Sequence, residues 1–312
     1  MSDVRLLDEA ERRTGRAPQD AAQDIARRLP NLVVAAREIA SSVAHGMHGR
    51  RRAGIGETFW QFRPFVAGEP SSNVDWRRSA RDDRLYVRER EWEAAHTVWI
   101  WIDRSASMGF TSKLALQPKI DRALVIGFAV ADLLMRGGER VGLLGLTRPL
   151  ATRNIIDRFA EALMTEEKHP RYAASELPPN AELQARSQVI WISDFLNDSA
   201  AINAKIEHLS VNGARGHLVM IADPIEETFP FTGHTEFVDV DSSARLRLGR
   251  AETYRDDYML RLAAHREAVR VAALRRGWTL LLNRTDRPAS EALLALRMRL
   301  EVGTEPQFAR AV

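Results

Sequence analysis

The sequence predicts an α/β fold, in which helices sandwich a mainly parallel sheet and an N-terminal helical and irregular extension comes first. From residue 97 onward, short apolar segments alternate with longer helical patterns, which is typical of βαβ units. Several of these segments are apolar at nearly every position, as expected of strands that are buried on both faces. With 312 residues, 45% of them hydrophobic and 28% charged, the chain has a globular composition and room for more than one folded unit.

The extension covers residues 1–95 in the expected division, and the unit of alternating strands and helices covers 96–312. Residues 1 to about 48 have helical patterns that Pro30 should interrupt. Residues 49–83 are rich in arginine and look irregular, and "RLYVREREW" alternates as a strand does. In this segment we expect Trp76 to be buried and its neighbouring arginines to pair with acids of the same chain.

The second part contains five apolar strands and several helices. The expected strands are 97–103, "VGLLGL", "QVIWISD", "HLVMIAD" and "WTLLLN". An edge pair is expected at "TEFVDVD" and "ARLRLGR". The expected helices lie near 116–136, 154–164, 180–186, 199–211, 252–276 and 288–301.

Composition excludes several classes of protein. The chain has no cysteine, so disulfides, thiolate metal sites and cysteine nucleophiles are excluded. The first residues are charged and lack the apolar core of a secretory signal. The longest apolar run, at 123–135, is shorter than the ~20 residues that a membrane-spanning helix needs. We therefore expect a cytoplasmic location.

One short stretch carries the candidate chemistry. In "VWIWIDRSASMGF" a buried strand runs into Asp103, with Ser105 and Ser107 at alternate positions. Asp194 ends the strand "VIWISD" in the same way, and carboxyl ends of parallel strands meet at one edge of a sheet. Carboxylate and hydroxyl oxygens are hard ligands that suit Mg²⁺ or Mn²⁺. The alternative is a simple turn in which these residues cap the next helix, the role that we expect for Asp223.

The pattern D-x-S-x-S at Asp103, Ser105 and Ser107 resembles the metal-ion-dependent adhesion site of von Willebrand factor type A domains. Upstream, "FRPFVAGEPSSNVDWRRSARDDRLYVREREWE" resembles the signature of the DUF58 family, whose core is such a domain. The resemblance covers roughly residues 45–240. It implies a metal site formed by these residues with Asp194, and a partnership with MoxR-type AAA+ ATPases.

Two departures from the family pattern concern the signature and the metal site. Where the family has a glycine-acid-acid-x-arginine run, this chain has "GEPSSN" and lacks one arginine. Type A domains also supply a threonine before the strand that bears the last aspartate. The matching stretch, "YAASELPPNAELQARSQ", has no threonine, and Ser175 is the candidate substitute.

These observations favour a metal-dependent protein-interaction module, an adaptor or client-recognition partner of a MoxR-type ATPase, over an enzyme. One alternative is nucleic-acid binding through the arginine-rich segment, in which Trp76 and its aromatic neighbours would stack on bases. Another is a hydrolase using Ser105 or Ser107, but the G-x-S-x-G elbow is absent and no histidine stands out as a base.

Overall fold

The computed structural model describes residues 18–45, 59–66, 69–81, 84–90, 96–169, 174–238 and 245–304. The chain forms two compact units, which are described separately. The sheet unit comprises residues 1–47 and 96–312, and the hairpin unit comprises residues 48–95. The expected boundary after residue 95 coincides with one edge of the hairpin unit, but residues 1–47 belong to the sheet unit and not to a single extension of residues 1–95.

The sheet unit is built on five parallel strands in the order β4-β3-β5-β6-β9. Their bounds are β3 Thr97–Ile102, β4 Arg140–Leu143, β5 Gln188–Ser193, β6 Arg215–Ala222 and β9 Thr279–Arg284. The expected α/β class is confirmed by this sheet and by the helices on both of its faces. A small antiparallel pair, β7 Thr235–Val238 and β8 Arg245–Leu248, lies at the expected place.

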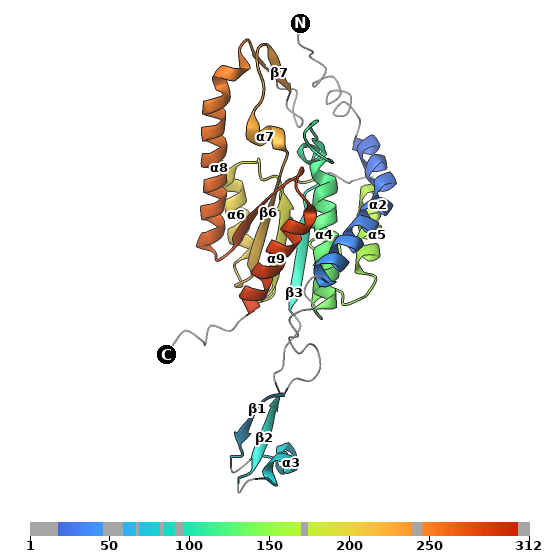
Figure 1. Cartoon of the computed structure of the whole chain (residues 1–312), viewed down its shortest axis with the longest axis vertical. Coiled ribbons are helices and arrows are strands. Elements are labelled where there is room, and N and C mark those ends of the chain that lie inside the picture. Colours follow the sequence, from blue (N-terminus) through green and yellow to red (C-terminus); the bar gives the residue numbers. More distant parts are fainter. Residues whose placement is uncertain are drawn as a thin grey trace. The chain divides into compact units, whose positions relative to one another are not determined.

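Helices cover both faces of the sheet (Figure 1). In Figure 1, α6 and α8 lie on one side, and α4, α5 and α2 lie on the other. The helix bounds are α2 Pro18–His45, α4 Lys119–Arg136, α5 Ile155–Glu167, α6 Ser199–Leu209, α7 Pro224–Thr228, α8 Arg255–Arg275 and α9 Ala289–Thr304. Short 3₁₀ helices in this unit are Ala106–Gly109 and Ala251–Tyr254. None of the described helices is both long enough and apolar enough to cross a membrane.

Side chains that alternate along β3 and β5 build two separate cores. Ile100, Ile102 and Ile192 pack with α4 and α9 in one core. Trp101 and Trp191 belong to the other core, where their rings meet edge to face at a centroid distance of 5.9 Å. Because successive strand residues face opposite ways, one apolar run supplies both cores, and the sheet is buried on both sides.

Helix α2 runs without a break from Pro18 to His45, so the expected interruption at Pro30 is wrong. Proline removes its own N–H donor and its ring crowds the carbonyl four residues earlier, but the apolar packing of neighbouring residues outweighs these costs. Leu29 and Leu32 are buried in the core shared with α4 and α9. The Arg28 guanidinium also reaches Asp121 of α4 at 2.8 Å. These contacts explain why the N-terminal helix belongs to the sheet unit.

Residues 180–186 form no helix, contrary to expectation. Arg186 takes a positive φ of 65°, which a right-handed helix does not allow, and Leu183 is buried below an extended segment. The chain therefore enters β5 from an irregular crossing. The other expected helices of the sheet unit are present, with ends that differ by a few residues.

The hairpin unit pairs β1 Phe59–Pro64 antiparallel with β2 Tyr86–Arg90. Between them lie the 3₁₀ helix Ser71–Asn73 and the single-turn helix α3 Trp76–Ser79, which Asp75 caps by accepting the Arg78 N–H at 2.9 Å. The Arg78 guanidinium covers the Tyr86 ring at 4.8 Å.

The expected burial of Trp76 is wrong, since 62% of the residue is exposed. Arg78 covers the aromatic surface of the hairpin in its place. Within the described residues of this unit, no ion pair joins Arg77, Arg78 or Arg81 to an acid. The expected partners Asp82 and Asp83 lie outside the described residues.

Gly216 of β6 offers a test of the packing on the second face. A Cβ at this position would overlap the Trp278 indole, which is fully buried. Although alanine is ordinarily better than glycine inside a strand, Gly216→Ala should lower the free energy of unfolding by about 1–3 kcal/mol. Gly249→Ala is the matched control, because its nearest neighbour, His234, is 3.7 Å away. Urea unfolding measures both, and equal effects would contradict this packing.

Candidate functional site

The candidate site lies at the carboxyl end of β3, where the chain leaves the sheet. The Asp103 N–H still donates to the Ile192 carbonyl of β5 at 2.9 Å, so the strand pairing extends to the first site residue. Asp103 is only 1% exposed and Ser105 is also buried. The D-x-S-x-S residues therefore leave the sheet from a fixed position and wrap into a 3₁₀ helix, Ala106–Gly109.

Both carboxylate oxygens of Asp103 accept hydrogen bonds from neutral donors. Oδ1 accepts from the Ser105 N–H at 2.8 Å, and Oδ2 accepts from the Ser193 hydroxyl at 2.7 Å. Burial raises the pKa of Asp103 from 3.8 to about 6, opposed by these hydrogen bonds and reinforced by the charge of Asp194. No ion pair neutralises Asp103 among the described residues. Within this part of the chain, its negative charge is therefore held without a compensating cation.

The hydroxyls of Ser105 and Ser107 lie 3.2 Å apart. Two adjacent ligands of an octahedral Mg²⁺ at 2.0–2.1 Å are about 3 Å from each other. Each Asp103 oxygen, although already hydrogen-bonded, keeps a second lone pair. The spacing of the two hydroxyls and the hard oxygen chemistry of all three side chains are thus compatible with a hard divalent cation. Among the described residues, no group of three or more His, Cys, Asp or Glu could hold a metal, so any such site depends on serine hydroxyls.

Asp194 is the first residue after β5, and β5 pairs with β3. Asp194 and Asp103 therefore follow neighbouring strand ends, as expected. The Asp194 Oδ2, however, accepts from the Lys119 ammonium at 2.8 Å, and the same ammonium binds Glu226 Oε1 at 2.7 Å. Burial would lower the pKa of Lys119, but the charges of Glu226 and Asp194 outweigh it and raise the pKa. The sequence interpretation missed Lys119 and Glu226.

Asp223 is a capping residue, as expected. Its oxygens accept the N–H groups of Ile225 and Ser112 at 2.9 and 2.8 Å. The Glu226 side chain in return accepts the Asp223 N–H at 2.9 Å, which completes a capping box at the start of α7. Glu226 therefore links this cap to Lys119.

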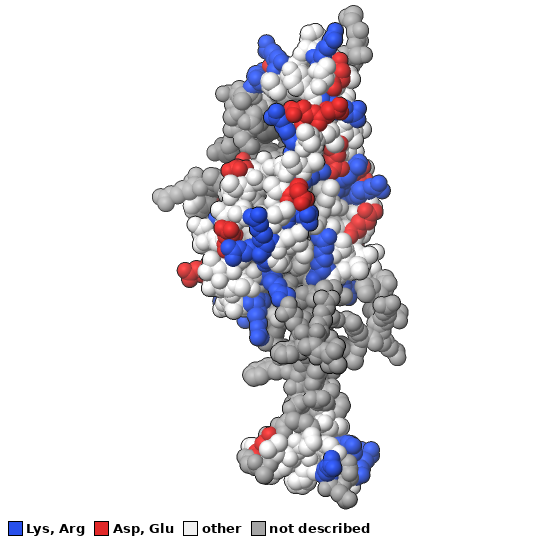
Figure 2. All heavy atoms as spheres, turned by 90° about the vertical axis from the view of Figure 1, so that its left-hand side faces the viewer, with Lys and Arg blue, Asp and Glu red and all other residues white. Residues whose placement is uncertain are grey.

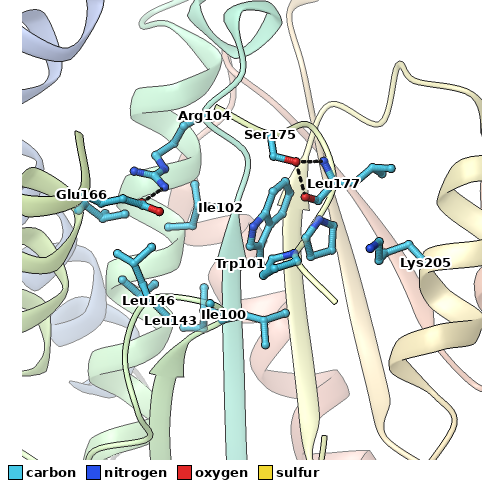
Figure 3. Close-up of a pocket in the computed structure, with 15 residues that line it drawn as sticks. Ile100, Trp101, Ile102, Arg104, Leu143, Leu146, Glu166, Ser175, Leu177 and Lys205 are labelled. Atoms are coloured by element: carbon cyan, nitrogen blue, oxygen red, sulfur yellow. Dashed lines mark hydrogen bonds and ion pairs between the residues drawn. The ribbon is translucent and has the colours of Figure 1, made fainter. Parts of the chain in front are cut away.

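A pocket of about 300 Å³ adjoins the site (Figure 3). Apolar side chains such as Trp101, Leu143 and Leu177 line part of its wall, and Arg104, paired with Glu166, contributes to a polar part of similar extent (Figure 3). It opens because β4 pairs with β3 only as far as Ile100. Beyond that residue, no described strand pairs with the end of β3 on this side.

Ser175 borders the same pocket and is exposed. Its hydroxyl donates to the Leu177 carbonyl at 2.7 Å, within its own loop (Figure 3). The structure describes no contact between Ser175 and the two site serines. None of the described contacts of Ser175 therefore puts it in the place of the missing threonine.

The structure thus defines an α/β protein with a polar site at the carboxyl edge of its parallel sheet. The family model described as "Protein of unknown function DUF58" matches residues 61–268, more than half of the chain. The chain belongs to the DUF58 family.

Relatives and solved structures give further comparisons. The uncharacterized proteins Rv1480 of Mycobacterium tuberculosis and Mb1516 of Mycobacterium bovis are each 26% identical over 281 residues, which cover 84% of this chain and 86% of each relative. An aerotolerance-related membrane protein from Bacteroides fragilis matches with a TM-score of 0.41 and 13% identity, over 67% of this chain and 100% of that one. The conserved hypothetical protein BatB from Bacteroides thetaiotaomicron gives 0.37 and 10%, over 68% and 100%.

The raised pKa of Asp103 predicts a pH dependence of stability in metal-free buffer. Between pH 4 and 6 the folded chain keeps a proton on Asp103 that the unfolded chain loses, so the free energy of unfolding falls as pH rises. The shift from 3.8 to about 6 corresponds to about 3 kcal/mol at full effect. Asp103→Asn should remove this loss, and urea unfolding of both chains from pH 4 to 8 measures the difference. A difference that does not change with pH would contradict the buried charge.

Proposed function

We propose that this chain is a protein-binding module and that its recognition point is the strand-end site of Asp103, Ser105 and Ser107. These residues would hold Mg²⁺ or Mn²⁺. When bound, such an ion supplies an open coordination position for a carboxylate of the partner. The observation that carries the proposal is the buried Asp103 carboxylate beside two hydroxyls 3.2 Å apart, with no described cation paired to it.

The surroundings of the site support binding rather than catalysis. The described bonds of the two serine hydroxyls join them to each other and to no histidine. His265 instead contacts the Phe195 carbonyl, and His217 contacts Thr279. The pocket beside Arg104 offers a second contact, which would receive an apolar side chain of the same partner on its apolar part. A polar anchor next to a partly hydrophobic cavity is the usual composition of a protein-binding hot spot.

The family resemblance suggests the partner, a MoxR-type AAA+ ATPase or its client. Such a protein would present a Glu or Asp to the site. The same reasoning places the chain as an adaptor rather than as the motor.

Metal binding can be tested through stability. A ligand that binds only the folded chain stabilises it by about 2.7 kcal/mol at a hundredfold excess over Kd. Millimolar Mg²⁺ or Mn²⁺ should therefore raise the melting temperature of the wild type, and Asp103→Ala or Ser105→Ala with Ser107→Ala should abolish the increase. Ser175→Ala is the control and should retain it, because its hydroxyl bonds only within its own loop. No metal effect in the wild type would contradict the proposed mechanism.

Partner binding can be tested by capture from an extract with mass spectrometry. Wild type should retain an AAA+ ATPase in Mg²⁺, and Asp103→Ala should not, although its circular dichroism is unchanged. The variant is a better control than EDTA, because a chelator also removes Mg²⁺ from the nucleotide of an ATPase. Equal capture by both chains would show that binding does not depend on this site.

Nucleic-acid binding by the hairpin unit is a second candidate, favoured by the exposure of Trp76. Arg77, Arg81 and Arg84 are also exposed, and Arg side chains gather on one side of this unit in Figure 2. Binding that relies on phosphates weakens steeply with salt. Salt-sensitive binding of single-stranded RNA or DNA that is lost in Trp76→Ala and kept in Asp103→Ala would favour this second function.

A further inference from the structure

A buried lysine adjoins the candidate metal site and has an unusual position. Lys119 is 1% exposed and is the first residue of α4. An ammonium is disfavoured there twice, since burial removes its water and a helix N-terminus carries a partial positive charge. Its two carboxylate partners, Asp194 at 2.8 Å and Glu226 at 2.7 Å, offset these costs, and the Phe110 ring lies 5.8 Å from the ammonium. A position this costly for a cation calls for a reason beyond helix formation.

The charges at this edge show what Lys119 does. Asp194 and Glu226 carry two negative charges, and Lys119 cancels one of them, so the three groups together carry one negative charge. Asp194 is within electrostatic reach of Asp103, whose pKa it raises. The Lys119 ammonium contacts the one Asp194 oxygen, and the Leu196 N–H contacts the other at 3.3 Å. Asp194 is thus paired with a cation, whereas the described hydrogen-bond donors to Asp103 are neutral.

We propose that Lys119 is a built-in counter-ion that withholds Asp194 from a divalent cation, so that the site binds the ion weakly through Asp103, Ser105 and Ser107 alone. This inference rests on the proposed function, because it concerns the same metal site. It makes Lys119 a residue that sets metal affinity without being a ligand. A weakly held ion needs a further ligand, and a partner's carboxylate would supply it.

The test is a charge-matched variant, Lys119→Met with Glu226→Gln. Wild type has a net charge of −1 over these three side chains, and the variant keeps −1 through Asp194 alone, so a general change in charge cannot explain the outcome. The side-chain amide that replaces the Glu226 carboxylate still offers an acceptor to the Asp223 N–H. We expect Mg²⁺ and Mn²⁺, measured by calorimetry on the full chain, to bind about tenfold more tightly or better, because a second carboxylate becomes available.

A third substitution tests whether Asp194 is the source of the higher affinity for the metal. Adding Asp194→Asn to the variant should return the affinity for Mg²⁺ to the wild-type value or below, and a gain that survives would overturn the role of Asp194. An unchanged or weaker affinity in the charge-matched variant would overturn the inference. A charge-matched variant that stays unfolded in millimolar Mg²⁺ would also overturn the inference. A charge-matched variant that folds only when Mg²⁺ is added would support the inference.

The same measurements separate this inference from the proposed function. If wild type binds Mg²⁺ and the charge-matched variant binds it no better, the inference about Lys119 fails and the metal site stands. If only the variant binds Mg²⁺, Lys119 does withhold Asp194 and the metal-dependent function of the wild type fails. If neither chain binds Mg²⁺ at millimolar levels, both are overturned.

Discussion

The register between β3 and β5 is the constraint on which the candidate site depends. Ile102 lies opposite Ile192, so Asp103 follows one strand end where Ser193 and Asp194 end the other. A slip of one residue would turn every side chain to the other face of the sheet. The isoleucines at one face and Trp101 with Trp191 at the other both resist such a slip, because each set fills its own core. Packing fixes the register, and the register places the site.

Four carboxylates converge at this edge, and the structure stabilises each of them differently. Asp223 accepts backbone N–H groups and caps α7, while Asp194 and Glu226 share the Lys119 ammonium. The described partners of Asp103 are neutral hydrogen-bond donors of Ser105 and Ser193. Neutral hydrogen bonds stabilise a buried carboxylate less than a cation does. Asp103, which begins D-x-S-x-S, and the helix cap Asp223 are therefore the two carboxylates of this edge without a described cation beside them.

Much of the fold could be predicted from the sequence because its signals are local. Apolar runs gave the strands, helical periodicity gave most helices, and Asp103 with Asp194 followed from the rule that parallel strands share a carboxyl edge. The break at Pro30 was wrong because proline was weighed by its local cost alone. The packing of Leu29 and Leu32 against other helices, which decides the outcome, is not visible in a local pattern.

The electrostatics of the site could be predicted only in part. Lys119 is one of four lysines in the chain, which is a signal of rarity but not of position. Its partners are 75 and 107 residues away in the sequence. A search of the sequence for metal ligands finds oxygen-bearing residues such as Asp194. It does not detect that Lys119 is already paired with Asp194. The expected burial of Trp76 was wrong for a similar reason, because the side chain that covers the Tyr86 ring of the hairpin belongs to Arg78, two positions later.

The short length of β4 joins the polar site to the pocket. Because β4 pairs with β3 only to Ile100, no described strand pairs with the last two residues of β3 on that side, and the pocket forms beside them. Asp103 follows these residues directly. In the proposed function, a partner's carboxylate would fix orientation at Asp103, and an apolar side chain in the pocket would add buried area. A single ionic contact gives little net affinity once desolvation is counted. In the proposed function, specific binding would therefore need the pocket as well as the metal, and a weakly bound metal would suffice when the pocket contributes.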